Sequence, residues 1–437
     1  VKFTTAAVVC SIFVILGATF SGAGAAHTLG KLGSVNALGG SFMAAFAAAI
    51  TVYWMTKLGL PVSTSQAIVG AIIGWNLFSG SITDTKALIK ILSTWVACPL
   101  LAGCIAVPIY IATTKLLGLA KFHLIRLDAY TRYALIFAGA FGSYSLGANN
   151  IANVMGVFVP VSPFTDFAIG DFMTFSSVQQ LFLLGAIAIA VGVFTYSKRV
   201  MLTVGGGLMP LSPVGAWVVV ISHSIVLFLF ASQGLEHLLA SNGLPTIPLV
   251  PVSSSQAVVG AVIGIGLYKG GKGIKWKVLV NISGGWVTTP IISALVCFVC
   301  LFFLQNVFDQ RVYTEIHFSL TKPVMEKLAT KGVSTGDLTE LEDKTYPRAV
   351  DFRSALRDVA SLSTADEYKV IQYAEITPIT IDPAKFEKMD PEWLSENQIT
   401  AVRGLSGKSF DNKWGVADAL ATQSPEWKTK PDTKVNK

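Results

Sequence analysis

Apolar side chains fill the first 304 residues and gather in long runs. A helix needs about 20 residues to cross a bilayer, and seven runs are long enough: 4–22, 36–56, 88–114, 132–160, 176–196, 211–233 and 278–304. Two further runs, 61–78 and 251–268, are shorter and begin with proline and hydroxyl residues. The pattern predicts an all-α polytopic membrane protein in which the two short runs form re-entrant half-helices.

The two short runs are copies of one another. Residues 61–74 align without gaps on residues 251–264, and eleven of the fourteen positions are identical. A long apolar span containing a tryptophan follows each copy, with Trp95 in the first and Trp286 in the second. We therefore expect an internal duplication.

The charges in the loops after the two copies predict how the repeats are oriented. Loop 269–277 has four lysines and no acidic residue, whereas loop 79–90 has two lysines and Asp84. The positive-inside rule places the first loop in the cytoplasm and the second on the opposite side. The expected architecture is a pair of inverted repeats, at 1–120 and 128–304, followed by a polar C-terminal tail at 305–437.

Composition sharpens this picture and excludes two classes of protein. The chain is 52% hydrophobic and 14% charged, with a mean hydropathy of +0.59, whereas soluble domains are about 25% charged. Residues 1–304 hold five acidic and fifteen Lys or Arg side chains. These bases lie in short loops, where they mark topology, so we expect a lipid bilayer and no nucleic acid as partner. The tail resembles a marginal soluble domain or a partly disordered extension, and no function follows from it.

Each short run begins with residues suited to binding an anion. Ser63 and Gln66, like Ser253 and Gln256, have the spacing of a capping box, in which serine and glutamine satisfy each other's backbone amides. The free amides and positive dipole of a helix start attract anions. Hydroxyl donors follow at Thr64 and Ser65 in the first copy and at Ser254 and Ser255 in the second. Simple capping of a buried helix end is the alternative, and we interpret both glutamines as caps.

Three asparagines lie inside the apolar run 132–160, at Asn149, Asn150 and Asn153. Such amides are costly in hydrocarbon unless they face protein, water or a ligand. Gly147 permits a helix break, after which Asn149 would be a good cap. Amides offer carbonyl oxygens to a cation and NH₂ donors to an anion. The alternative role is hydrogen bonding between helices.

These motifs resemble those of the inorganic phosphate transporter family of secondary carriers, which includes sodium- or proton-coupled phosphate carriers and some sulfate permeases. The resemblance rests on a Gly-Ala-Asn-Asp-x-Ala-Asn motif, here residues 147–153, and on a Pro-Val-Ser-Thr-Thr-His motif, here residues 61–66 and 251–256. It implies that both motifs help to form phosphate and sodium sites near the centre of the membrane. It also implies that each repeat carries both.

The chain departs from the family pattern in three ways. The first asparagine motif would fall before Val1, so we expect an N-terminally truncated protein. Asn150 stands where the family has an aspartate. This difference favours sulfate over phosphate as the substrate, because sulfate has no proton to give a carboxylate. Gln66 and Gln256 stand where the family often has histidine.

The sequence therefore predicts a secondary transporter that moves inorganic phosphate by alternating access, coupled to Na⁺ or H⁺. We expect no enzyme activity, metal centre or other cofactor, and a location in the plasma (inner) membrane; a homodimer is left open. The predicted substrate-binding residues are Ser63, Thr64, Ser65, Ser253, Ser254, Ser255, Asn149, Asn150 and Asn153. Of these, Asn149, Asn150, Thr64 and Ser254 are also candidate cation ligands. The alternatives are a sulfate permease of the same fold and, more distantly, an anion sensor with a signalling tail.

Overall fold

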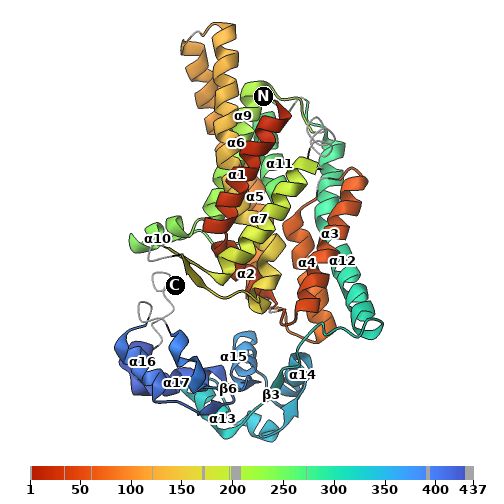
Figure 1. Ribbon diagram of the computed structural model, residues 1–437. Helices are drawn as coiled ribbons and strands as arrows, with labels where there is room; N and C mark the ends of the chain where they lie inside the picture. The colour runs from red at the N-terminus through yellow and green to blue at the C-terminus, as the bar shows by residue number, and fades with distance from the viewer. Residues whose placement is uncertain are drawn as a thin grey trace. The chain divides into compact units, whose positions relative to one another are not determined.

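The computed structural model describes residues 2–33, 35–60, 62–120, 122–169, 173–195, 197, 208–271, 273–389 and 394–428. The chain divides into two units (Figure 1). The larger one comprises Val1–Phe78 and Thr83–Tyr313, and the smaller one comprises Ser79–Ile82 and Thr314–Lys437. The long stretch of the smaller unit, from Thr314 on, corresponds to the predicted tail at 305–437, whose bounds stay a prediction.

The larger unit is a bundle of helices with a single short hairpin among its described residues. Six of its helices are long and apolar enough to cross a membrane: α1 (Phe3–Ser21), α3 (Leu38–Lys57), α5 (Thr85–Ala120), α7 (Ser177–Thr195), α9 (Pro213–Ala231) and α12 (Trp276–Asn306). These six correspond to six of the seven predicted spans. The remaining elements are α2 (Ala23–Leu32), α4 (Thr64–Ser79), α6 (Leu124–Met155), η1 (Gly156–Val161), β1 (Phe167–Ile169), β2 (Met173–Phe175), α10 (Gln233–Ser241) and α11 (Ser254–Tyr268). The chain is an integral, multi-pass membrane protein.

The seventh predicted span is α6, and it differs from the expectation in one respect. Gly147 does not break the helix, which continues through the asparagines to Met155. The glycine is needed for packing instead, because a Cβ there would lie 2.2 Å from the carbonyl oxygen of Val14 on α1. Gly17 on α1 approaches the carbonyl oxygen of Tyr144 in the same way. Small residues thus let the α1 and α6 backbones touch.

The two short helices, α4 and α11, have the lengths expected of half-helices. They have 16 and 15 residues, so each rises about 22 to 24 Å, less than the roughly 30 Å hydrocarbon core. Both begin at the predicted hydroxyl residues. Their insertion as re-entrant segments stays a prediction.

Each short helix packs against the long helix that follows the other copy. On α4, a Cβ at Gly70 would lie 2.1 Å from the carbonyl oxygen of Pro290 on α12. On α11, a Cβ at Gly260 would lie 2.1 Å from the carbonyl oxygen of Pro99 on α5. Gly70 and Gly260 occupy equivalent positions in the alignment of the copies, and each proline stands four residues after the tryptophan of its span, as a duplicated fold requires. Figure 1 shows α4 beside α12 at one edge of the bundle, and α3 lies at the same edge in contact with α12.

The smaller unit mixes short helices with short strands. A three-stranded antiparallel sheet has the order β4-β3-β5, and a separate pair joins β6 to β7. Phe318, Phe352 and Leu356 belong to its main apolar core. Its elements are β3 (His317–Ser319), α13 (Lys322–Thr330), η2 (Asp337–Leu341), β4 (Thr345–Tyr346), α14 (Ala349–Val359), α15 (Thr364–Ala374), β5 (Glu375–Ile376), β6 (Ile379–Thr380), η3 (Pro383–Lys388), α16 (Glu396–Arg403), β7 (Ser409–Phe410), α17 (Lys413–Gln423) and η4 (Pro425–Trp427). The described part of the tail is therefore folded.

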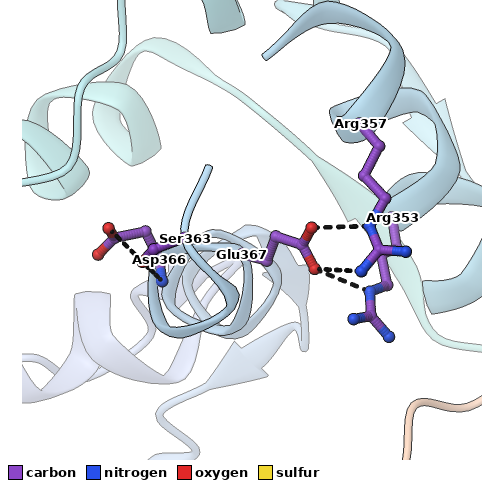
Figure 2. A network of polar contacts seen from close by, with 5 residues as sticks. All are labelled: Arg353, Arg357, Ser363, Asp366 and Glu367. Carbon is purple, nitrogen blue, oxygen red and sulfur yellow. Dashed lines mark hydrogen bonds and ion pairs between the residues drawn. The ribbon is translucent and has the colours of Figure 1, made fainter. Parts of the chain in front are cut away.

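A buried carboxylate joins two helices of this unit. Glu367 on α15 is 5% exposed and accepts hydrogen bonds from Arg353 and Arg357 on α14, with donor–acceptor distances of 2.7 to 3.0 Å (Figure 2). At the start of α15, Ser363 accepts from the amide of Asp366 at 3.1 Å. The hydrogen bond from Arg357, with help from Arg353, lowers the pKa of Glu367 although burial opposes the shift.

Candidate functional site

The hydroxyl half of the predicted cap is present at both short helices. The amide of Gln66 donates to Ser63 Oγ at 3.3 Å, and the amide of Gln256 donates to Ser253 Oγ at 3.2 Å. The glutamine half is not formed, because the side-chain oxygens of Gln66 and Gln256 are buried and have no hydrogen-bond partner among the described residues. The interpretation of these two glutamines as caps was therefore wrong.

The starts of α4 and α11 lie in contact with each other, although 187 residues separate the atoms that join them. Ser65 Oγ, at the start of α4, donates to the carbonyl oxygen of Val252 at 3.1 Å. Val252 directly precedes the cap residue Ser253. The positive ends of two helix dipoles thus meet in one region, which is a favourable environment for an anion.

Asn149 on α6 holds the chain just before α11. Its side-chain oxygen accepts from the amide of Val252 at 3.1 Å, and its NH₂ donates to the carbonyl oxygen of the same residue at 2.8 Å. Asn149 is fully buried. Both ends of this amide are occupied by backbone, so in this conformation Asn149 positions the start of α11.

Asn153, one helical turn further along α6, contacts the other short helix. Its NH₂ donates to Ser65 Oγ at 2.9 Å and to the side-chain oxygen of Asn150 at 3.3 Å. The side-chain oxygen of Asn153 is buried and has no partner among the described residues. That carbonyl is an acceptor available to a cation or to a protonated oxyanion.

The other predicted residues lie around this junction and form fewer contacts. Ser253 and Ser255 hydroxyls are 3.0 Å apart. Ser254 and Ser255 are half-buried and Thr64 is exposed. The structure therefore brings Asn149, Asn150, Asn153, Ser65 and the start of α11 together, and it places Ser63, Thr64, Ser253, Ser254 and Ser255 on the first turns of the two helices. Their roles in binding stay predictions.

The sequence did not reveal all of the residues that hold the junction. The backbone of Val252 is its main acceptor and donor, and Cys98 on α5 places its thiol 3.6 Å from the carbonyl oxygen of Ser253. No side-chain pattern identifies a backbone role. The paired prolines Pro99 and Pro290 do repeat in the two copies, and that signal could have been found.

The described residues of the junction contribute neutral amides, hydroxyls, backbone groups and the thiol of Cys98. They can bind and orient an ion through dipoles and hydrogen bonds. Among the described residues, the junction includes no carboxylate and no imidazole. Such groups suit the binding of an ion.

Comparison with known proteins agrees with this chemistry. The profile of the phosphate transporter family, PHO4, matches residues 1–127, 120–297 and 240–345. The chain belongs to the phosphate transporter family. The family consists of transporters and permeases, and the expectation that the protein is not an enzyme agrees with this membership.

Relatives within the phosphate transporter family are distant in sequence. A candidate phosphate permease of Methanocaldococcus jannaschii is 28% identical over 290 residues, which are 66% of this chain and 82% of that protein. The sodium-dependent phosphate transporter 1-A of Xenopus laevis is 25% identical over 166 residues, 38% of this chain and 22% of its own length. A solved structure titled "The sodium-dependent phosphate transporter" has a TM-score of 0.52 at 23% identity, covering 70% of this chain and 91% of that one. This last likeness concerns the fold.

Proposed function

We propose that the protein carries inorganic phosphate across the membrane by alternating access, in symport with a cation. The observation that supports this most is the junction of the two capped helix starts, tied by Ser65 to Val252. Two helix N-termini and several hydroxyl donors facing one region favour a tetrahedral oxyanion. Substrate sites of many secondary transporters lie between half-helix ends near the midplane, and inverted repeats would let the two halves alternate.

Sodium is the coupling ion we propose first. Relatives in Xenopus are named sodium-dependent phosphate transporters. Sodium is a hard cation that favours oxygen ligands, and the unpartnered side-chain oxygen of Asn153 lies at the junction. Phosphate uptake should therefore fall when choline replaces sodium in the external buffer. Equal uptake in both buffers, with a dependence on pH, would favour protons instead.

Sulfate is the second candidate substrate, and Asn150 is the observation that favours it. A carboxylate at this position could accept the proton of monohydrogen phosphate, whereas an amide removes the charge that would repel sulfate. Uptake of labelled phosphate and labelled sulfate by proteoliposomes separates the two. We expect phosphate uptake that unlabelled phosphate inhibits. Sulfate uptake with which phosphate does not compete would overturn the choice of substrate.

The hydroxyls on the first turns provide a direct test of the binding region. If Thr64 and Ser254 contact the substrate, Thr64→Ala combined with Ser254→Ala should raise the phosphate KM about tenfold, through loss of hydrogen bonds to a charged group. The amount of folded protein in the membrane should change far less. An unchanged KM would leave these hydroxyls as parts of a helix end only.

A further inference from the structure

In each copy, one tryptophan and one glutamine have a buried polar atom without a partner among the described residues. The indole nitrogens of Trp95 and Trp286 are buried and have no hydrogen-bond partner among the described residues, and the same holds for the side-chain oxygens of Gln66 and Gln256. Each glutamine is at most 2% exposed. An indole N–H only donates and an amide oxygen only accepts. Each repeat therefore contributes one unsatisfied donor and one unsatisfied acceptor.

The packing register places each tryptophan level with a glutamine of the other repeat. Gly70 on α4 faces Pro290 on α12, and four residues later Gly74 faces Ala294, with 2.4 Å from its ideal Cβ to the carbonyl oxygen. The two helices therefore run in the same direction in register. One turn before the first contact stand Gln66 and Trp286.

The same register relates α11 to α5. Gly260 faces Pro99, and a Cβ on Gly264 would lie 2.7 Å from the Cα of Gly103. One turn before the first of these contacts stand Gln256 and Trp95. Both unsatisfied pairs thus arise from one arrangement that occurs twice.

Proline adds a third polar group to each pair. A proline inside a helix provides no N–H to the carbonyl four residues earlier. Pro290 therefore frees the carbonyl of Trp286, and Pro99 frees that of Trp95. Each location combines two acceptors with one donor, because the glutamine oxygen and the freed carbonyl accept while the indole N–H donates.

This combination selects one kind of ligand. A cation would be repelled by the indole N–H, and an anion by the two oxygens. A water molecule matches all three groups, since it accepts one hydrogen bond and donates two, and buried waters typically form about three.

We propose that one buried water bridges Trp286 to Gln66 and that a second bridges Trp95 to Gln256, making the two tryptophans positioning residues for the glutamine amides. Each bridge holds the glutamine oxygen away from its own helix cap and fixes the orientation of the amide at the helix start. The link from that orientation to phosphate rests on the proposed function, whereas the bridge itself does not.

A double-mutant cycle on the full chain tests the bridge. Trp286→Phe keeps the ring but removes the donor, and Gln66→Met keeps the chain length but removes the acceptor. We expect each single variant to lower the melting temperature of the phosphate-free protein in detergent, and the double variant to lower it no further than the larger single effect. Additive shifts would overturn the proposal. Coupling that disappears when choline replaces sodium would also overturn it, because the bridging ligand would then be a cation.

Matched controls use the same substitutions elsewhere. Trp54 on α3 is 53% exposed, so Trp54→Phe combined with Gln66→Met should be additive. The crossed pair, Trp286→Phe with Gln256→Met, should also be additive, since its members belong to different bridges. Coupling as strong in the crossed pair would indicate a general loosening of the bundle and would contradict the proposal.

Transport kinetics separate positioning from simple support of the fold. In proteoliposomes, Trp286→Phe should raise the phosphate KM about fivefold, within the range of one lost hydrogen bond, while the maximal rate per folded protein stays within twofold. An unchanged KM with a lower maximal rate would contradict the positioning role. If the wild type takes up no phosphate, the proposed function fails, and the melting-temperature cycle still decides the bridge.

Discussion

The pattern Ser-x-x-Gln occurs at the starts of α7 and α16 and at the starts of the short helices α4 and α11. The glutamine side chain has different hydrogen bonds in the two groups. At α7 and α16 the box is complete: the backbone amides of Ser176 and Ser395 each donate a hydrogen bond to the side-chain oxygen of the glutamine three residues later, at 3.0 Å. At α4 and α11 the serine caps the helix, but the glutamine oxygen does not return to the serine. The same four-residue pattern thus forms a complete cap at α7 and α16 and leaves the glutamine oxygen outside the cap at the two short helices.

At the two short helices, contacts from neighbouring segments stand in for the missing glutamine half of the cap. Asn149 grips the backbone before α11 with both ends of its amide, and Ser65 links α4 to the same backbone group. Close glycine contacts with Pro99 and Pro290 hold the bodies of the two helices. The variants below test this contrast, starting with the largest expected effect.

Disturbing the close packing of the two short helices, α4 and α11, should have the largest effect. In Gly70→Ala or Gly260→Ala, the new Cβ would lie 2.1 Å from a proline carbonyl oxygen. Both sides of this contact are helix backbone, so relieving the clash requires the two helices to move apart. We expect loss of most of the folded protein, seen as a vanished monodisperse peak in size-exclusion chromatography. Gly139→Ala is the control, because a Cβ there meets nothing within 4 Å. Equal peaks for all three variants would contradict the packing.

Removing the grip of Asn149 should have the next largest effect. Asn149→Ala deletes both hydrogen bonds to Val252 and leaves the Val252 amide buried without a partner, which costs about 1 to 3 kcal/mol. The Val252 carbonyl keeps its hydrogen bond from Ser65. Phosphate uptake should fall at least tenfold and the melting temperature should drop. Asn149→Asp keeps the acceptor for the Val252 amide but places a carboxylate against its carbonyl oxygen, so it should not rescue uptake. Full uptake by the alanine variant would remove Asn149 from the site.

Much of this arrangement was predictable, and what was missed has a physical reason. The apolar runs and the duplicated Pro-Val-Ser segments predict the long helices and the two short ones, because hydrophobic length and helix caps are local properties. The continuity of α6 through Gly147 was not predictable, since it depends on the backbone of α1. The hydrogen bonds between Asn149 and Val252 join residues 103 positions apart in the sequence and involve the backbone of Val252. No local sequence pattern can therefore reveal them.

The tail illustrates the same limit. Its strands have two or three residues each, too few to show a period-two pattern. They are strands because β3 pairs with both β4 and β5. Composition alone therefore predicted a marginal domain where pairing and a buried core give a folded one.

Acidification should destabilise the tail unit before it affects the two short helices, because the described residues at their junction are uncharged. The pKa of Glu367 is lowered in the fold by its hydrogen bond from Arg357. A lowered folded pKa means that the carboxylate stabilises the unit above its unfolded pKa of about 4.3. This contribution is lost as the pH falls through the folded value. Below about pH 4.3, the rate of hydrogen exchange over residues 349–374 of the full chain, taken relative to the intrinsic rate at each pH, should rise.

A neutral variant checks the assignment of that pH dependence. Glu367→Gln should cost about 1.5 to 3 kcal/mol, the range for hydrogen bonds to charged groups, and should make exchange at pH 7 faster in residues 349–374. The added effect of acid on this segment should then shrink. If acid raised the hydrogen exchange of this segment equally in the variant and the wild type, the pH dependence would belong to a group other than Glu367.

The smallest effect is expected at the complete box of α16, and it tests whether the two kinds of glutamine really differ. Gln398→Met removes the acceptor for the amide of Ser395 and should destabilise this helix start by about 0.5 to 1 kcal/mol, seen as faster hydrogen exchange at residues 395–399. Phosphate uptake should not change. Gln66→Met is the same substitution at a half-helix, where the oxygen caps nothing, so it should leave exchange at residues 63–67 nearly unaltered while raising the phosphate KM. If both variants changed only local exchange, the half-helix glutamine would be an ordinary cap, and the contrast between the two settings would fail.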